Sequence, residues 1–163
     1  MRDDATFNFE SYAECFVSEN LVRMFITDRK IPLSTEAKAE ADKWKQREGE
    51  SKNKGNISIG IRRHPTDLSY LSMDDLANLV DKPQDKLKQA ALARDATEFK
   101  PMRDAVAHTA LLTDAAKQRL RAVRDNIKGR IKTLLVRQVG ESDPKRGRAP
   151  KSGSKKKPSR KKR

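Results

Sequence analysis

The chain is poor in cysteine and has no long apolar run. Cys15 is the only cysteine among 163 residues, which excludes a disulfide within the chain and a cysteine-based zinc site, and which fits a reducing compartment. No segment approaches the roughly 20 apolar residues of a membrane span. The opening stretch MRDDATFNFE also lacks the apolar run of a signal peptide. We therefore expect a cytoplasmic protein without a membrane partner.

The sequence also lacks the local patterns that hold cofactors or metals. Gly55 and Gly60 are too isolated to cradle a phosphate, and no cluster of metal ligands or serine triad is visible. We therefore expect neither a cofactor nor a metal.

Positive charge is abundant and unevenly distributed. The formal net charge is +14, of which residues 141–163 carry a net +9, and this leaves +5 for residues 1–140. The C-terminal segment has too few apolar residues to offset the entropy cost of ordering, so we predict one domain at 1–140 followed by a disordered tail. The tail cations predict nucleic-acid binding through phosphate neutralisation. They are Lys145, Arg146, Arg148, Lys151, Lys155, Lys156, Lys157, Arg160, Lys161, Lys162 and Arg163.

Apolar spacing predicts an all-α fold, a bundle of four to six helices. The first helix is expected to end before Pro32. The apolar face that we expect it to bury consists of Phe9, Tyr12, Phe16, Leu21, Met24 and Phe25. A second helix, capped by Ser34, is charged nearly all round, and its only apolar stripe is Ala37, Ala41 and Trp44. We expect that helix to be peripheral, and the alternating Ile57, Ile59 and Ile61 to form a short strand.

The C-terminal half of the body carries the clearest helix signals. Ser72 and Asp75 form a capping-box-like start of a helix that ends at Pro83. Residues 84–99 are alanine-rich and helical in pattern, and Pro101 suits the first position of a separate helix from Met102 to Leu112. The last helix begins at Thr113 or Asp114 and ends near Val139. Its apolar stripe is Ala116, Leu120, Val123, Ile127, Ile131 and Leu134, and its basic side is Lys117, Arg121, Arg124, Lys128 and Lys132.

The stretch FKPMRDAVAHTALL, residues 99–112, holds the chemistry that could act on a phosphate. Arg103 and His108 lie five residues apart, about 140° from each other on a helix. In the simplest interpretation Arg103 is solvated and His108 hydrogen-bonds a neighbouring helix. In the functional interpretation His108 transfers protons near neutral pH and Arg103 holds a phosphate through its bidentate fork. Together they would suffice for phosphodiester cleavage without a metal, and a basic body and tail suit an RNA substrate.

The segment MRDAVAHTALLT resembles the R-x4–6-H motif of the HEPN superfamily, small helical domains of higher eukaryotes and prokaryotes associated with nucleotide binding. The preceding segment LSYLSMDDLANLVDK and the long helix after the motif also resemble that family, so the likeness covers roughly residues 66–138. Arg103 and His108 match the two fixed positions of the motif. Asp104 stands where the family commonly has asparagine, and it could orient His108 or pair with Arg103.

This resemblance implies an all-α bundle that forms a homodimer with a composite site across the interface. It also implies a metal-independent endoribonuclease, in many members a toxin or a component of antiviral defence, with Arg103, His108 and Asp104 as catalytic residues. Two alternatives remain open: a non-catalytic nucleic-acid-binding protein, and an interaction module for an antitoxin or a larger defence assembly.

Other polar and aromatic residues have simpler expected roles. Asp95 and Glu98 are expected on a solvated face, and the alternative is that either orients the site. His64 is expected in an exposed loop before Pro65, and the alternative is contact with phosphate together with Arg62 and Arg63. Trp44 is expected to dock its helix, and Cys15 to be inert core.

Overall fold

The computed structural model describes residues 2–55, 66–81 and 91–141, and all secondary structure in these residues is helical. The elements are α1 (Arg2–Asp28), α2 (Thr35–Lys54), the 3₁₀ helix η1 (Asp67–Tyr70), α3 (Met73–Val80), α4 (Ala91–Ala107) and α5 (Asp114–Glu141). The all-α prediction is confirmed. The strand expected near Ile57 and the cations of the tail lie outside the described residues.

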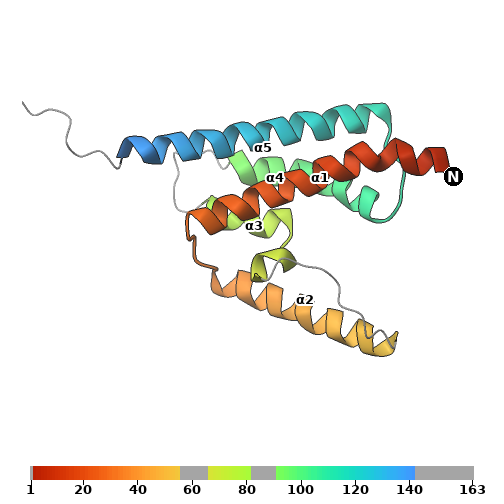
Figure 1. Cartoon of the computed structure of the whole chain (residues 1–163), viewed down its shortest axis with the longest axis horizontal. Coiled ribbons are helices and arrows are strands. Elements are labelled where there is room, and N and C mark those ends of the chain that lie inside the picture. Colours follow the sequence, from red (N-terminus) through yellow and green to blue (C-terminus); the bar gives the residue numbers. More distant parts are fainter. Residues whose placement is uncertain (1, 56–65, 82–90, 142–163) are drawn as a thin grey trace, which may run out of the picture.

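The bundle consists of α1, α3, α4 and α5, with α2 set to one side (Figure 1). The long helices α1 and α5 lie side by side, α4 packs against both, and α3 packs against α1 and α4. The main contact of α2 is with η1. As predicted, α2 is peripheral and buries Ala37 and Ala41, but Trp44 stays half exposed and does not dock the helix.

The predicted stripe of α5 and the predicted start of α3 are both confirmed. Leu120, Val123, Ile127 and Ile131 are buried in the core. At the start of α3, Ser72 Oγ accepts from the Asp75 amide (3.3 Å), and an Asp75 carboxylate oxygen accepts from the Ser72 amide (3.1 Å). Such a reciprocal pair satisfies two of the free donors at a helix start.

Most of the apolar face expected to be buried on α1 faces solvent. Phe9, Tyr12, Phe16 and Met24 are 58–66% exposed. As expected, Phe25 is buried and Leu21 packs against the core. The opposite side of the helix enters the core instead, through Ser11, Glu14, Cys15, Ser18, Val22 and Ile26. Because α1 has apolar residues on both sides, periodicity alone could not identify the side that packs. The burial of Cys15 is as predicted.

Pro101 lies inside α4 and does not begin a new helix. The helix continues through it because Leu92, Ala96, Phe99 and Met102 are all buried on one side of a single rod, whereas Pro101 itself is exposed. The expected boundary was therefore wrong: packing outweighs the local preference of proline for a first turn. The helix also ends at Ala107, before the expected end at Leu112.

Asp95 is buried, contrary to the expectation of a solvated carboxylate. It accepts a hydrogen bond from Arg130 Nε, which joins α4 to α5, while its Oδ1 atom has no hydrogen-bond partner among the described residues. Glu98 is partly exposed, one turn further along α4, and pairs with Arg119.

Candidate functional site

The candidate catalytic residues lie at the C-terminal end of α4. This end closes as a Schellman turn: Thr109 N–H donates to the Val106 carbonyl (3.1 Å) and Ala110 N–H to the Ala105 carbonyl (2.9 Å). Thr109 has φ 62°, the left-handed conformation that such a turn requires. His108 is therefore the C-cap residue, directly after the last residue of α4, and its side chain is exposed.

Arg103 is held between two carboxylates. Its Nε donates to Glu19 Oε1 on α1 (3.2 Å), and its Nη1 to Asp104 Oδ1 (3.4 Å). The other oxygen of Glu19 accepts from Arg23 (2.8 Å). The Arg103 side chain is nevertheless 45% exposed. Of the two roles considered for Asp104, the structure shows the pairing with Arg103.

The segment after His108 is anchored to α1 by Asn8. Asn8 Nδ2 donates to the Ala110 carbonyl (2.7 Å), and Asn8 Oδ1 accepts from the Leu112 amide (3.5 Å). Arg103 and Ala110 are thus bonded to two points of α1 that lie eleven residues apart. The Arg103 side chain and the backbone that follows His108 are thus both bonded to α1, but within the described residues no hydrogen bond joins Arg103 to His108 in one chain.

The basic side of α5 is partly neutralised by α1. Arg121 pairs with Glu10, and both Arg121 (3.5 Å) and Arg124 (3.1 Å) pair with Glu14. Glu14 is buried, and this burial raises the pKa of its carboxyl despite the opposing effect of Arg124 and Arg121. Sequence reasoning missed Glu14, although the Glu10–Glu14 spacing of four residues places both carboxylates on one helix face.

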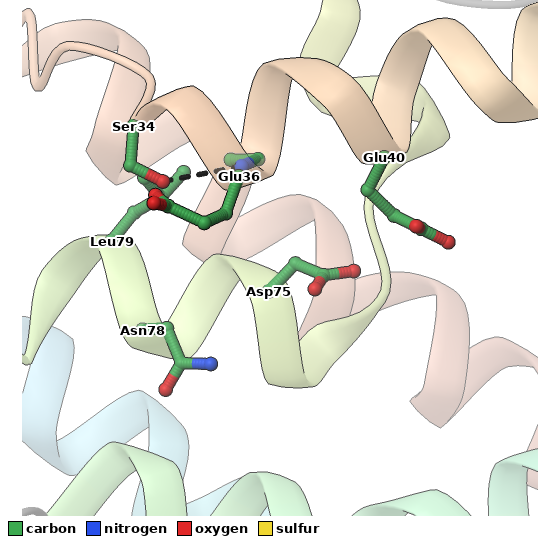
Figure 2. Close-up of a pocket in the computed structure, with 7 residues that line it drawn as sticks. Ser34, Glu36, Glu40, Asp75, Asn78 and Leu79 are labelled. Carbon is green, nitrogen blue, oxygen red and sulfur yellow. Dashed lines mark hydrogen bonds between the residues drawn. The ribbon is translucent and has the colours of Figure 1, made fainter.

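A separate hollow of about 220 Å³ lies between the start of α2 and α3 (Figure 2). Its polar lining is mainly acidic, since Glu36, Glu40 and Asp75 supply three carboxylates. Asp75 is already used in the cap of α3, and Ser34 Oγ caps α2 by accepting from the Ala37 amide (3.1 Å). None of the motif residues lines this hollow, and its charge does not suit a phosphate.

In the described part of the chain, no group of three or more His, Cys, Asp or Glu side chains is arranged to hold a metal ion. Of the helices that the structure describes, none combines the length and apolar composition needed to cross a membrane. His64 lies outside these residues.

Comparison of the chain with family models, with curated proteins and with solved structures found no match.

Proposed function

We propose that this protein is a metal-independent endoribonuclease of the HEPN type that acts on RNA in the cytoplasm, as a toxin or a component of antiviral defence. The observation that supports this most directly is the exposure of Arg103 and His108 at one rigid helix end. A cation that binds phosphate and a group that transfers protons are both accessible there to an RNA strand.

The expected reaction is attack of a substrate 2′-oxygen on the adjacent phosphorus. The bond from phosphorus to the 5′-oxygen breaks, which leaves a 2′,3′-cyclic phosphate and a 5′-hydroxyl. The 2′-hydroxyl loses a proton to one base and the 5′-oxygen gains a proton from one acid, and His108 is the motif group able to serve. Arg103 would stabilise the charge that develops on the phosphate. Because one chain offers one such histidine in the motif, a homodimer would supply the acid and the base from two copies.

Binding of a phosphate at Arg103 must compete with Glu19 and Asp104. The exposed guanidinium can turn toward a phosphate while the Arg103 stem stays packed, because Glu19 keeps Arg23 as a second partner. The polybasic tail would add affinity that does not depend on sequence.

The direct test is incubation of the purified full-length chain with total RNA in EDTA. Wild type should cleave, whereas His108→Ala should lower the rate by roughly a hundredfold to ten-thousandfold, the usual loss on removing an acid–base group. Arg103→Ala should lose nearly as much, and Arg103→Lys should restore little because lysine lacks the fork.

His64→Ala and Arg94→Ala are matched controls, since they change the only other histidine and an exposed arginine of α4 outside the motif. Both should cleave like wild type. Intact RNA at high concentrations of wild type, or full activity in His108→Ala, would refute the enzymatic proposal.

One observation favours the alternative of a non-catalytic module that binds nucleic acid or a partner protein such as an antitoxin. Arg103 already joins α4 to α1 through Glu19, which is a structural role. Glu19→Gln separates the two functions, because it weakens this link and frees the guanidinium. If Glu19→Gln still cleaves RNA, or cleaves it faster, the result supports catalysis by Arg103. If wild type does not cleave RNA, and Glu19→Gln and Arg103→Ala lose equal stability, the result supports the non-catalytic module.

A further inference from the structure

The first half of α1 carries three exposed aromatic side chains. Phe9, Tyr12 and Phe16 are 66%, 61% and 58% exposed, and we call them the aromatic patch. The Tyr12 and Phe16 rings stack, with their centroids 6.5 Å apart and their planes inclined by 27°. Exposed aromatic side chains that are grouped, rather than scattered singly, indicate an interaction site.

The aromatic patch lies beside the end of α4 that carries the motif. Asn8 of α1 donates to the Ala110 carbonyl (2.7 Å). Glu19, eleven residues further along α1, accepts from Arg103 Nε (3.2 Å). At about 100° per residue, Tyr12 lies within about 40° of both residues around the helix axis, and it lies between them along that axis. Because Tyr12 is nevertheless 61% exposed, the end of α4 borders this ring without covering it.

The size of the aromatic patch suits nucleobases better than a protein surface. Three rings that are about 60% exposed offer on the order of 360 Å², if a fully exposed aromatic side chain contributes about 200 Å². That is less than half of the roughly 800 Å² that each partner buries in a specific protein interface. Val17 and Met24 are also exposed, but they lie about 80–100° from Phe16 around the helix axis, away from the end of α4.

The charges around the aromatic patch also suit an anionic strand. Arg103, whose side chain is 45% exposed, and the exposed His108 lie at the neighbouring end of α4. No carboxylate between positions 9 and 24 of α1 is left unpaired, because all three of them bind arginines. The pairs are Glu10 with Arg121, Glu14 with Arg121 and Arg124, and Glu19 with Arg103 and Arg23.

We infer that the aromatic patch is a stacking platform for unpaired bases of the RNA strand whose phosphate binds Arg103. Each phosphate within a single strand is flanked by two nucleotides, so a strand held at Arg103 brings a base beside Tyr12 and Phe16. Stacking on aromatic rings tolerates any base, because every base has a π-face. The paired bases of a duplex are not free to stack on the rings, so the platform selects single-stranded RNA. The position of the phosphate rests on the proposed function, whereas the stacking itself does not require cleavage.

Strands with and without bases test the platform in the full-length protein. One probe is a labelled 2′-O-methyl strand of mixed sequence, which the proposed reaction cannot cleave, and the other is an abasic strand of equal length and charge. Both offer the polybasic tail the same phosphates, so the ratio of their Kd values isolates the contribution of the bases. Wild type should bind the strand with bases roughly tenfold to hundredfold more tightly. A ratio near one would leave the patch to a protein partner and overturn the inference.

Variants of the exposed rings test where the bases stack. Tyr12→Ser and Phe16→Ser should each lower the ratio toward one with an unchanged helical circular-dichroism signal. Tyr12→Phe should keep the ratio, because a phenyl ring still stacks. Trp44→Ser is the matched control, since Trp44 is 45% exposed but belongs to α2, and it should keep the wild-type ratio. An unchanged ratio in both serine variants of α1, or its loss in Trp44→Ser, would contradict the platform.

Cleavage of unmodified RNA separates this inference from the proposed function. A wild type that shows the base-dependent ratio but leaves RNA intact would refute the endoribonuclease and support the platform. A wild type that cleaves RNA with a ratio near one, or that cleaves duplex and single strands equally well, would refute the platform alone.

Discussion

At the level of single residues, Glu14 is a carboxyl whose charged form the fold disfavours. It is buried on α1 beside Arg121 and Arg124, and burial raises the pKa of its carboxyl more than the arginines lower it. The native state therefore holds this proton more tightly than the unfolded chain does. The resulting stabilisation is complete below the unfolded pKa and is lost as the pH rises through the raised folded value.

Glu14→Gln removes this titration. The urea midpoint of the variant minus that of wild type should therefore be larger at pH 7 than at pH 4. Urea unfolding of both proteins at the two pH values measures the effect. If the stability of wild type relative to Glu14→Gln instead increased as the pH rises, the effect of the two arginines on the Glu14 carboxyl would outweigh that of burial.

At the level of elements, two ion pairs join α4 to α5 and differ in burial. Asp95 is almost fully buried where it meets Arg130, whereas Glu98 and Arg119 are 31% and 61% exposed. Arg130→Met should therefore lower the free energy of unfolding by about 3 kcal/mol, because it leaves the Asp95 carboxylate buried without a partner. Arg119→Met should cost about 0–1 kcal/mol. Urea unfolding of the two variants measures both losses of free energy. Equal losses would mean that burial does not determine how much each ion pair contributes to stability.

The elements also show what the sequence could predict. The α5 stripe and the α3 cap were predictable, because both depend on spacings within one segment. The packed side of α1 and the continuity of α4 through Pro101 were not, because they depend on which neighbouring helices cover Val22 and Phe99. For the candidate site, the motif positions came from the sequence. The pairing of Arg103 with Glu19 did not, since these residues are 84 positions apart.

At the level of the whole molecule, eleven cations follow α5 in the sequence, whereas five form its basic side. Removal of residues 142–163 leaves α5 whole and should weaken binding to single-stranded RNA. It should also flatten the slope of log Kd against log salt, by up to about 8 if every cation neutralises a phosphate. Fluorescence anisotropy over a salt series measures both. A chain with the same tail composition in scrambled order is the control and should bind like wild type, whereas an unchanged slope in the truncated protein would contradict tail binding.

The peripheral position of α2 has a consequence for how the molecule comes apart. Only Ala37 and Ala41 of this helix are buried, and its main neighbour is η1 rather than the core of α1, α4 and α5. Few apolar contacts oppose its release, so α2 belongs to the low-stability end of local unfolding. We therefore expect α2 to open before the rest of the molecule, while the four bundle helices, including the end of α4 that carries Arg103 and His108, keep their places.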